Sequence, residues 1–471
     1  MKPPKGTASA LPDSKQTPRL HVVQRGFTDP FAGEVHPDMM LDPAFPYGEE
    51  LLQFIWEQRL FDGRSLRTTD GRVLEIIRPG RIQQDSGPDL LGAEVRVDGQ
   101  LWIGAVEVHL RSSDWNAHGH QFDPAYGSVV LHVVHAHDLD IRMNNGAIPP
   151  TLELHARISK ESIAVHLSLM RDQGFVPCAS MLQRVGADHW SLWLERVLVE
   201  RLERKAAEVE ALFHRLEGDP TETLYHMVAK AFGLKVNADP FGMLAHALPL
   251  KLLQKYRDDA LRIEALLFGQ AGMLQADLVD DHPRALQAEY GALAHLHGLR
   301  SNPLAAWKFT RMRPVNFPTI RIAQFAQLLI HTDGDLSELL AHEEVTPLHA
   351  LLDVGTSTYW TTHYTFDVPS HTRAKRMGRA GSDHLIINAI VPTLFALGRV
   401  MGRPAYTERA MDLLDQLPPE RNALLRQWAE LNVHADTAGR GQALLELKNL
   451  YCTPRRCLSC RVGNQLLKNA V

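Results

Sequence analysis

The sequence predicts a protein of two parts, an N-terminal α/β part built on a mixed β-sheet and a larger all-α part. Three observations predict this fold class. The chain has 471 residues, which is more than one core of ordinary size accommodates. Short runs rich in β-branched residues gather in the first third of the chain. From about residue 160 onward, apolar side chains recur at the three-to-four-residue spacing of helices.

The α/β part is expected to span residues 45–158. It opens with GEELLQFIWEQRLF, whose apolar side chains follow helical spacing, and RVLEIIRPG, a short strand that ends in a Pro-Gly turn. Two strands, 89–97 and 100–111, flank Asp98-Gly99, a dipeptide typical of a tight β-hairpin. VVLHVVHAHD and TLELHA read as two more strands.

The helical part is expected to occupy residues 159–471. Its clearest amphipathic segments are WSLWLERVLVERLERKAAEVEALFHRL, RIEALLFGQAGML, RIAQFAQLLIH, TERAMDLLDQL and ALLRQWAEL. No internal repeat is evident in the sequence. Residues 1–44 are rich in Pro, Gly and small polar residues without periodicity, so we expect a mostly disordered or extended arm there.

Composition excludes several classes of protein. With 45% apolar and 22% charged residues the chain is not disordered throughout, and a net charge of −5 gives no overall attraction to nucleic acid. The first residues lack the apolar core of a signal peptide. The most apolar stretch, 385–398, contains Asn388 and Pro392 and is too short to span a bilayer. We therefore expect a cytoplasmic protein that does not enter the membrane.

The second hairpin strand carries the most informative side chains. Period-two alternation sends Glu107, His109 and Arg111 to one face of strand 100–111. An imidazole or guanidinium two residues after a metal ligand can orient an attacking water or balance charge on a phosphate, and we assign these roles to His109 and Arg111. The competing interpretation is the solvated face of an edge strand.

A second carboxylate starts the neighbouring strand. Asp89 follows a Pro and can approach Glu107, and two carboxylates from adjacent strands make a hard-oxygen site suited to Mg²⁺ or Mn²⁺. The preceding helix offers Glu50, or alternatively Glu57, as a further acid.

This arrangement carries a geometric condition. A two-residue turn pairs Val97 with Gln100 and so places Asp89 opposite Val108, on the face away from Glu107. A three-residue loop, or one β-bulge near Gly92, is required to bring the two acids together.

The Pro-Asp at 88–89 and the Glu-Val-His at 107–109 resemble the motif of the PD-(D/E)xK nuclease superfamily. In that superfamily a helix acid, a Pro-Asp on one strand and an acid-x-Lys on the next bind metal and cut phosphodiesters. The resemblance implies a restriction-endonuclease-like fold for residues 45–158 and a divalent cation at the two strand acids. The chain departs from the motif because His109 stands where the superfamily has Lys, and Arg111 would then supply the positive charge.

Over its whole length the chain also resembles a bacterial family known as domain of unknown function 2851. The stretches that carry this resemblance are LLQFIW, SGPDLLGAEV, VEVHLRSSDW, VVLHVV, EALLFGQAG, RPVNFP and YCTPRRCLSC. This resemblance implies no assigned activity.

Histidines crowd the segment after the hairpin. The residues are Asp114, Trp115, His118, His120, Asp123, Tyr126 and His132. Three interpretations stay open for His118 and His120: a role in the active site, where they would bind phosphate or a second metal, a separate zinc site, and ordinary packing in a solvated loop. His132 lies in an apolar run and is expected to be a hydrogen-bonded core histidine.

The four cysteines are unevenly placed. Cys452, Cys457 and Cys460 are close in sequence but supply only three thiolates, whereas zinc and iron–sulfur sites prefer four. Cys178 is the remaining candidate, so we expect a shared metal site, with buried or free thiols as the alternative. Some nucleases of the superfamily named above close an iron–sulfur cluster with one distant and three clustered cysteines, which favours [4Fe-4S] over Zn²⁺.

Three basic segments contain no acid and suggest a nucleic-acid-binding surface if they converge. Their cationic residues are Arg300, Lys308, Arg311, Arg313 and Arg321; Arg373, Lys375, Arg376 and Arg379; and Lys448, Arg455, Arg456, Arg461 and Lys468. From these we select Arg311, Arg313 and Arg376, with His118 and His120, as candidate substrate-binding residues. A solvated surface is the simpler interpretation of any one segment.

Together these features predict a metal-dependent nuclease that acts on DNA or RNA. Its catalytic residues would be Asp89, Glu107, His109, Arg111 and Glu50. One alternative is an inactive nuclease-like fold that serves as a nucleic-acid-binding or assembly module. Another is a His/Asp metal hydrolase with a small substrate, whose metal would lie at His118 and His120.

Overall fold

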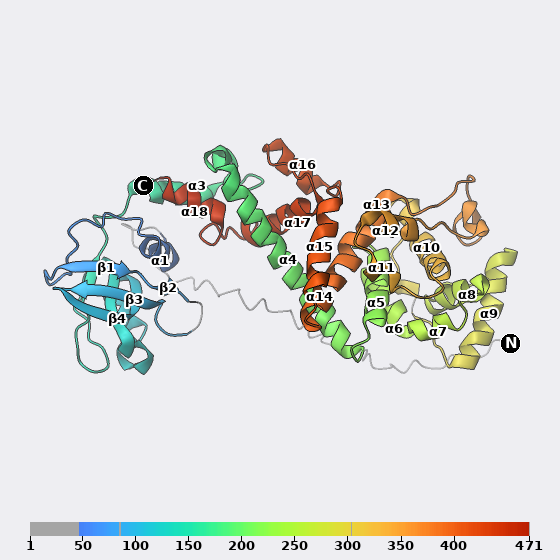
Figure 1. Cartoon of the computed structure of the whole chain (residues 1–471), viewed down its shortest axis with the longest axis horizontal. Coiled ribbons are helices and arrows are strands. Elements are labelled where there is room, and N and C mark those ends of the chain that lie inside the picture. Colours follow the sequence, from blue (N-terminus) through green and yellow to red (C-terminus); the bar gives the residue numbers. More distant parts are fainter. Residues whose placement is uncertain (1–46, 84–85, 303, 471) are drawn as a thin grey trace, which may run out of the picture.

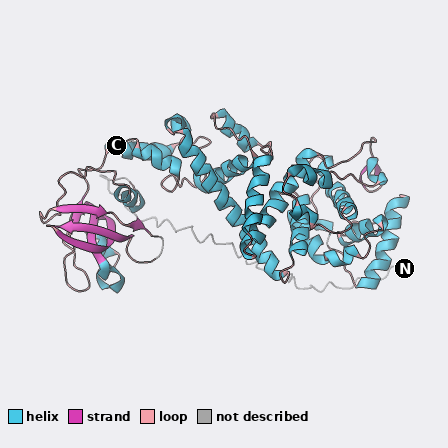
Figure 2. Ribbon diagram, viewed as in Figure 1, coloured by secondary structure: helices cyan, strands magenta, loops and turns pink. Residues whose placement is uncertain are grey.

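The computed structural model describes residues 47–83, 86–302 and 304–470. The molecule is elongated, with its large sheet at one end of the longest axis and helices along the rest (Figures 1 and 2). The two-part α/β plus all-α organisation expected from the sequence is present at this level. The arm predicted for residues 1–44 lies outside the described residues.

A mixed sheet with the strand order β1-β3-β4-β5-β6, and with β2 also paired to β3, forms the N-terminal part. The strands are β1 (Leu74–Arg78), β2 (Arg81–Ile82), β3 (Leu90–Val97), β4 (Gln100–Arg111), β5 (Val129–Ala136) and β6 (Thr151–Glu153). The pairs β1–β3, β2–β3 and β3–β4 are antiparallel, whereas β4–β5 and β5–β6 are parallel. The parallel pairs place the segment between β4 and β5 next to the end of β4.

The β3–β4 hairpin contains the bulge that the sequence required. Val97 pairs with Gln100 across the Asp98-Gly99 turn, whose residues have φ of +47° and +83°. The register then shifts by one between Ala93 and Leu90, where Gly92 has φ of +70°. A positive φ costs glycine little, so Gly92 permits the bulge.

The two faces of β4 pack against different partners. Val106 and Val108 are fully buried in the core that also receives Leu52 and Trp56 of helix α1 (Glu49–Glu57). Ala105 belongs to a separate small cluster that includes Trp115 and Tyr126. Since alternate residues share a face, Glu107 and His109 lie on this second side of the sheet.

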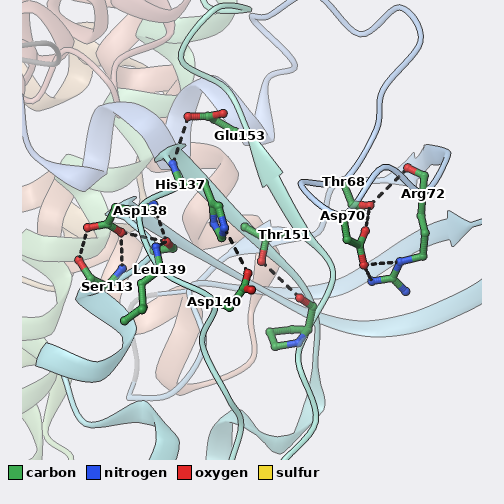
Figure 3. Close-up of polar contacts among 12 residues, drawn as sticks. Thr68, Asp70, Arg72, Ser113, His137, Asp138, Leu139, Asp140, Thr151 and Glu153 are labelled. Carbon is green, nitrogen blue, oxygen red and sulfur yellow. Dashed lines mark hydrogen bonds and ion pairs between the residues drawn. The ribbon is translucent and has the colours of Figure 1, made fainter.

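Polar contacts hold the loops around the sheet in place (Figure 3). Asp138, which follows β5, accepts hydrogen bonds from the hydroxyls of Ser112 and Ser113 at the end of β4, at 2.9 and 2.7 Å. In Figure 3, Glu153 of β6 likewise accepts the His137 amide hydrogen at 3.1 Å. The serine contacts join the end of β4, just before the histidine-rich segment, to the loop after β5.

Helices form the remainder of the described chain, apart from the small hairpin of β7 (His363–Thr365) and β8 (Val368–Pro369). The helices that follow the sheet are α3 (Lys160–Arg171), α4 (Ala187–Arg215), α5 (Pro220–Phe232), α6 (Ala238–Ala247), α7 (Leu250–Gln254), α8 (Ala260–Gln270), α9 (Asp281–His297), α10 (Pro318–His331), α11 (Glu338–Ala341), α12 (Val345–Leu352), α13 (Arg379–Leu385), α14 (Val391–Val400), α15 (Pro404–Gln416), α16 (Ala423–Glu430), α17 (Ala438–Leu447) and α18 (Arg461–Lys468). A short helix α2 (Asp114–Ala117) follows β4. One continuous core cluster runs through the helical part.

Within the described residues, one helical stretch, Arg379–Val400, is long and apolar enough to cross a bilayer. Of its most apolar window, 72% is buried inside the protein, as expected for a core helix.

The C-terminal helix α18 departs from the simple two-part division. It packs on α3, and its Leu467 belongs to the core of the sheet part, so the last helix joins the two parts (Figure 1).

Candidate metal centre

Asp89 and Glu107 lie on the same side of the sheet and touch. The Asp89 amide donates a hydrogen bond to Oε2 of Glu107 at 3.0 Å, and the Val108 amide donates to Oδ2 of Asp89 at 3.0 Å. The register shift at Gly92 produces this contact, because without it Asp89 would face the opposite side. The geometric condition set by the sequence is therefore met.

The helix acid beside these two residues is Glu49, not Glu50. Glu50 is exposed, whereas Glu49 accepts a hydrogen bond from the Leu110 amide of β4 and interacts electrostatically with Asp89 and Glu107. Successive helix residues differ by about 100° in direction, so a shift of one position exchanges the buried acid for an exposed one. One turn later, Gln53 donates a hydrogen bond to Asp89.

Burial makes this cluster of acids costly to ionise. Glu107 is only 3% exposed. Burial raises the pKa of Asp89 to about 6, with a further contribution from Glu107. Burial, followed by the charges of Asp89, Asp114 and Glu107, raises the pKa of Glu49 to about 8. A positive charge placed beside these three acids would offset their mutual repulsion.

Three histidines border the carboxylates. Each of His109, His118 and His120 offers a ring nitrogen, and the three nitrogens lie within 4.8 Å of one another. Nε2 of His109 and Nε2 of His120 lie 3.5 and 3.2 Å from Oε1 of Glu107. Nε2 of His120 is buried and has no aligned hydrogen-bond partner. The imidazoles thus present nitrogen ligands next to the oxygen ligands.

His132 fixes His109 from behind. Nδ1 of His109 and Nε2 of His132 are 2.9 Å apart, which confirms His132 as a hydrogen-bonded core histidine. Burial lowers the pKa of His109 well below 6.5 and that of His132 to about 3, so both rings stay neutral near pH 7. The other ring nitrogen of His109, Nε2, lies 3.2 Å from Nδ1 of His118, so His109 stands between two histidine rings.

Trp115 and Tyr126 support the histidines. Trp115 is fully buried, and the Tyr126 ring stacks on His120 with their centroids 3.8 Å apart. Burial and the nearby Glu107 and Asp89 raise the pKa of Tyr126 to about 12. The phenol therefore remains protonated beside the acids.

The other candidate residues are distributed differently. Arg111 is exposed at the end of β4. Arg311 and Arg313 are exposed, but they precede α10 in the helical part, at the opposite end of the longest axis from the sheet (Figure 1). Arg376 pairs with Asp353, with Nη2 and Oδ2 2.9 Å apart.

Two further basic residues of these segments are structural. Lys375 is buried and donates to the carbonyl oxygens of Trp360 and Thr361. Arg321 binds Asn316 and Gln324 inside the fold, and burial lowers its pKa to about 10. These two side chains therefore do not contribute to an exposed basic surface.

The sequence missed Glu49 and Gln53. Their spacing of four residues places them on one face of α1 and was a usable signal, but it did not say which face meets β4. The sequence did single out His118, His120 and Tyr126 in the histidine-rich segment. His120 contacts Glu107 and stacks on Tyr126, and the exposed His118 lies against His109 and His120.

The comparisons with known proteins identify a family, and the description of that family assigns no activity. No curated protein and no solved structure matches the chain. A family described as a protein of unknown function, DUF2851, matches residues 49–423, which include the whole sheet and the carboxylate and histidine cluster. Because this match covers most of the sequence, the chain belongs to the DUF2851 family.

Proposed function

We propose that the protein is a metal-dependent nuclease that hydrolyses phosphodiester bonds, with its active site at Asp89, Glu107 and Glu49. The single observation that carries this proposal is the contact between Asp89 and Glu107 across a β-bulge, with a helix acid beside them. One helix acid and two strand acids are the arrangement that the PD-(D/E)xK superfamily uses. A bound Mg²⁺ or Mn²⁺ would polarise the phosphate and lower the pKa of an attacking water.

The chain's own residues divide the remaining work. Asp89 and Glu107 would hold the cation, and Glu49, once ionised beside the bound cation, would accept a proton from water. His109 and His120 lie beside Glu107 and would orient the water. Because His109 is neutral, the positive charge opposite the phosphate would come from the cation and from Arg111 at the strand end.

The test is cleavage of DNA and RNA by the purified chain with Mg²⁺, with Mn²⁺ and with EDTA. Asp89→Asn and Glu107→Gln should each abolish metal-dependent cleavage. Glu49→Gln should lower the rate by about 10²–10⁴-fold, the usual range for loss of a general base, while the exposed neighbour Glu50→Gln should stay near the parent rate. Full activity in both Asp89→Asn and Glu107→Gln would remove the assignment.

A second candidate is a metal hydrolase with a small substrate, which the cluster of three histidine nitrogens favours. In that case Zn²⁺ would bind His109, His118 and His120, and activity on a small ester or phosphate would be lost in His118→Ala but survive Asp89→Asn.

An inactive nuclease-like fold would bind nucleic acid without metal-dependent cleavage, and it need not bind Mg²⁺ or Mn²⁺ at all.

A further inference from the structure

The C-terminal segment brings four cysteines together from two distant parts of the chain. Cys178 precedes the 3₁₀ turn that leads into α4, and Cys452, Cys457 and Cys460 lie between α17 and α18. All four are buried and none forms a disulfide. All four belong to one buried core cluster, and Cys178 and Cys452 each interact electrostatically with Cys457 and Cys460, so four thiols from two segments converge in one buried place.

The spacing of sulfur ligands differs between a zinc ion and an iron–sulfur cluster. Zinc binds four thiolates tetrahedrally at about 2.3 Å, which holds each pair of sulfurs about 3.8 Å apart. Among the described residues, however, the groups of three or more ligand atoms within 4.8 Å of one another include no cysteine set. In a [4Fe-4S] cluster each thiolate binds a different iron, so the sulfurs stand farther apart around a larger body.

The surroundings fit a bound cluster. The amides of Val462 and Gly463 at the start of α18 donate hydrogen bonds to the Cys460 sulfur, and the buried Trp193 indole also lies beside it. A Cβ on Gly463 would lie 2.2 Å from the Cys457 carbonyl oxygen, so only glycine allows this approach. Amide donors and an apolar wall are the groups that stabilise and tune iron–sulfur sites.

The same segment fastens α18 to the rest of the protein. Leu467 of α18 is buried in the core of the sheet part, and the Ser162 hydroxyl of α3 donates to its carbonyl oxygen at 3.4 Å. Arg455, between the cysteines, donates to the carbonyl oxygen of Met170 at 3.0 Å. Whatever binds the cysteines therefore holds α18 in the position where it joins the two parts.

We infer that Cys178, Cys452, Cys457 and Cys460 bind one [4Fe-4S] cluster that clasps the C-terminal helix α18 between the helical part and the sheet. The site is separate from the carboxylates and does not depend on the proposed nuclease activity. On binding iron each thiol would lose its proton and become a thiolate. The positive charge of the iron would offset the cost of burying these four thiolates. No redox reaction is assigned to the cluster.

The test uses the full chain, produced in iron-supplemented cells and purified without oxygen. We expect four iron and four acid-labile sulfide per chain and the broad visible absorption of a cluster. Cys178→Ser and Cys452→Ser should lose at least half of the iron and sulfide, whereas the exposed Ser459→Ala, in the same segment, should keep both. One zinc per chain with no sulfide, or no metal at all, would overturn the cluster, and full iron and sulfide in Cys178→Ser would overturn the four-cysteine assignment.

A second measurement tests whether the cluster holds α18 in place. Hydrogen exchange of the α18 peptide should be slow in the parent chain and in Ser459→Ala, and at least tenfold faster in Cys178→Ser and after removal of the cluster. Exchange in α18 that is unchanged by cluster loss would contradict the structural role. Asp89→Asn serves as a control, because it should leave the iron content and α18 exchange unchanged even if it removes nuclease activity.

Discussion

Replacing Glu49 by Gln should remove much of the pH dependence of stability in the metal-free protein. The pKa of Glu49 is raised from an ordinary value of 4.5 to about 8, mainly by burial. Between these two values the folded chain keeps a proton that the unfolded chain releases. The free energy of unfolding therefore falls by about 1.4 kcal/mol per pH unit across this window. Gln has no proton to lose, so Glu49→Gln removes this slope.

The width of the pH interval between the two pKa values of Glu49 sets the size of the stability difference. Going from pH 4.5 to pH 7 crosses about 2.5 units, so Glu49→Gln should gain roughly 3 kcal/mol relative to the parent over that interval. Asp89, whose pKa is raised to about 6, adds a similar slope at lower pH in both proteins and cancels in the comparison. Glu50 is the exposed neighbour of Glu49 on the same helix, so Glu50→Gln is the matched control.

The assay is denaturant unfolding from pH 4.5 to pH 8 in EDTA, followed by hydrogen exchange of the peptides that contain β3 and β4. Saturating Mn²⁺ should stabilise the parent more than Glu49→Gln, because the cation binds the ionised cluster. Parallel stability curves for the parent and Glu49→Gln in EDTA would refute the reasoning, since Glu49 would then not be a buried acid in the cluster.

Three further predictions concern metal binding and the core. The affinity for Mn²⁺, measured by calorimetry, should rise about tenfold per pH unit between pH 6 and pH 8, as Glu49 releases its proton, and more steeply below pH 6, where Asp89 also does. Gly92→Val, which disfavours the φ of +70° that the bulge requires, should favour in-phase pairing, turn Asp89 toward the other face and weaken Mn²⁺ binding by about tenfold in the same assay; unchanged affinity would show that the bulge is not needed. Leu467→Ala should destabilise the sheet part by about 2–5 kcal/mol in denaturant unfolding, because its side chain fills that core, whereas a loss confined to the helical part would contradict this packing.

The sequence contained much of the site because its signals were local. The Asp98-Gly99 turn set the hairpin, alternation placed Glu107 and His109 on one face, and counting back from the turn showed that a bulge near Gly92 was needed. Each of these rests on neighbours in the chain or across a single turn, where geometry leaves few choices.

Features that depend on how separate elements dock were not accessible in this way. The choice between Glu49 and Glu50 depends on the rotation of α1 about its axis against β4. The apolar pattern of the helix determines this rotation only to within about one residue. Leu467 could not be assigned to the sheet core, because the pattern of an eight-residue amphipathic helix does not show which element its apolar face packs against. The basic segments looked like one surface in sequence, but Arg376 is paired and Lys375 is buried.

His109 decides what kind of pH profile a nuclease at this site can have. A lysine at this position would carry a charge, but burial and the neighbouring His132, His118 and His120 lower the pKa of His109 well below 6.5. His109 therefore does not change its protonation between pH 6 and pH 8, and it cannot produce a limb of the profile there.

At Mn²⁺ concentrations well below saturation, where the rate reports the ionisation of the metal-free protein, the rate should instead rise through about pH 6 and pH 8 with the ionisation of Asp89 and Glu49. His109→Gln, which keeps a polar side chain without a titrating ring, should lower the rate while leaving the shape of this profile unchanged. Glu49→Gln should remove the upper rise. If His109→Gln removes a limb between pH 6 and pH 8, the imidazole titrates during catalysis, and the neutral role assigned to it from its burial is wrong.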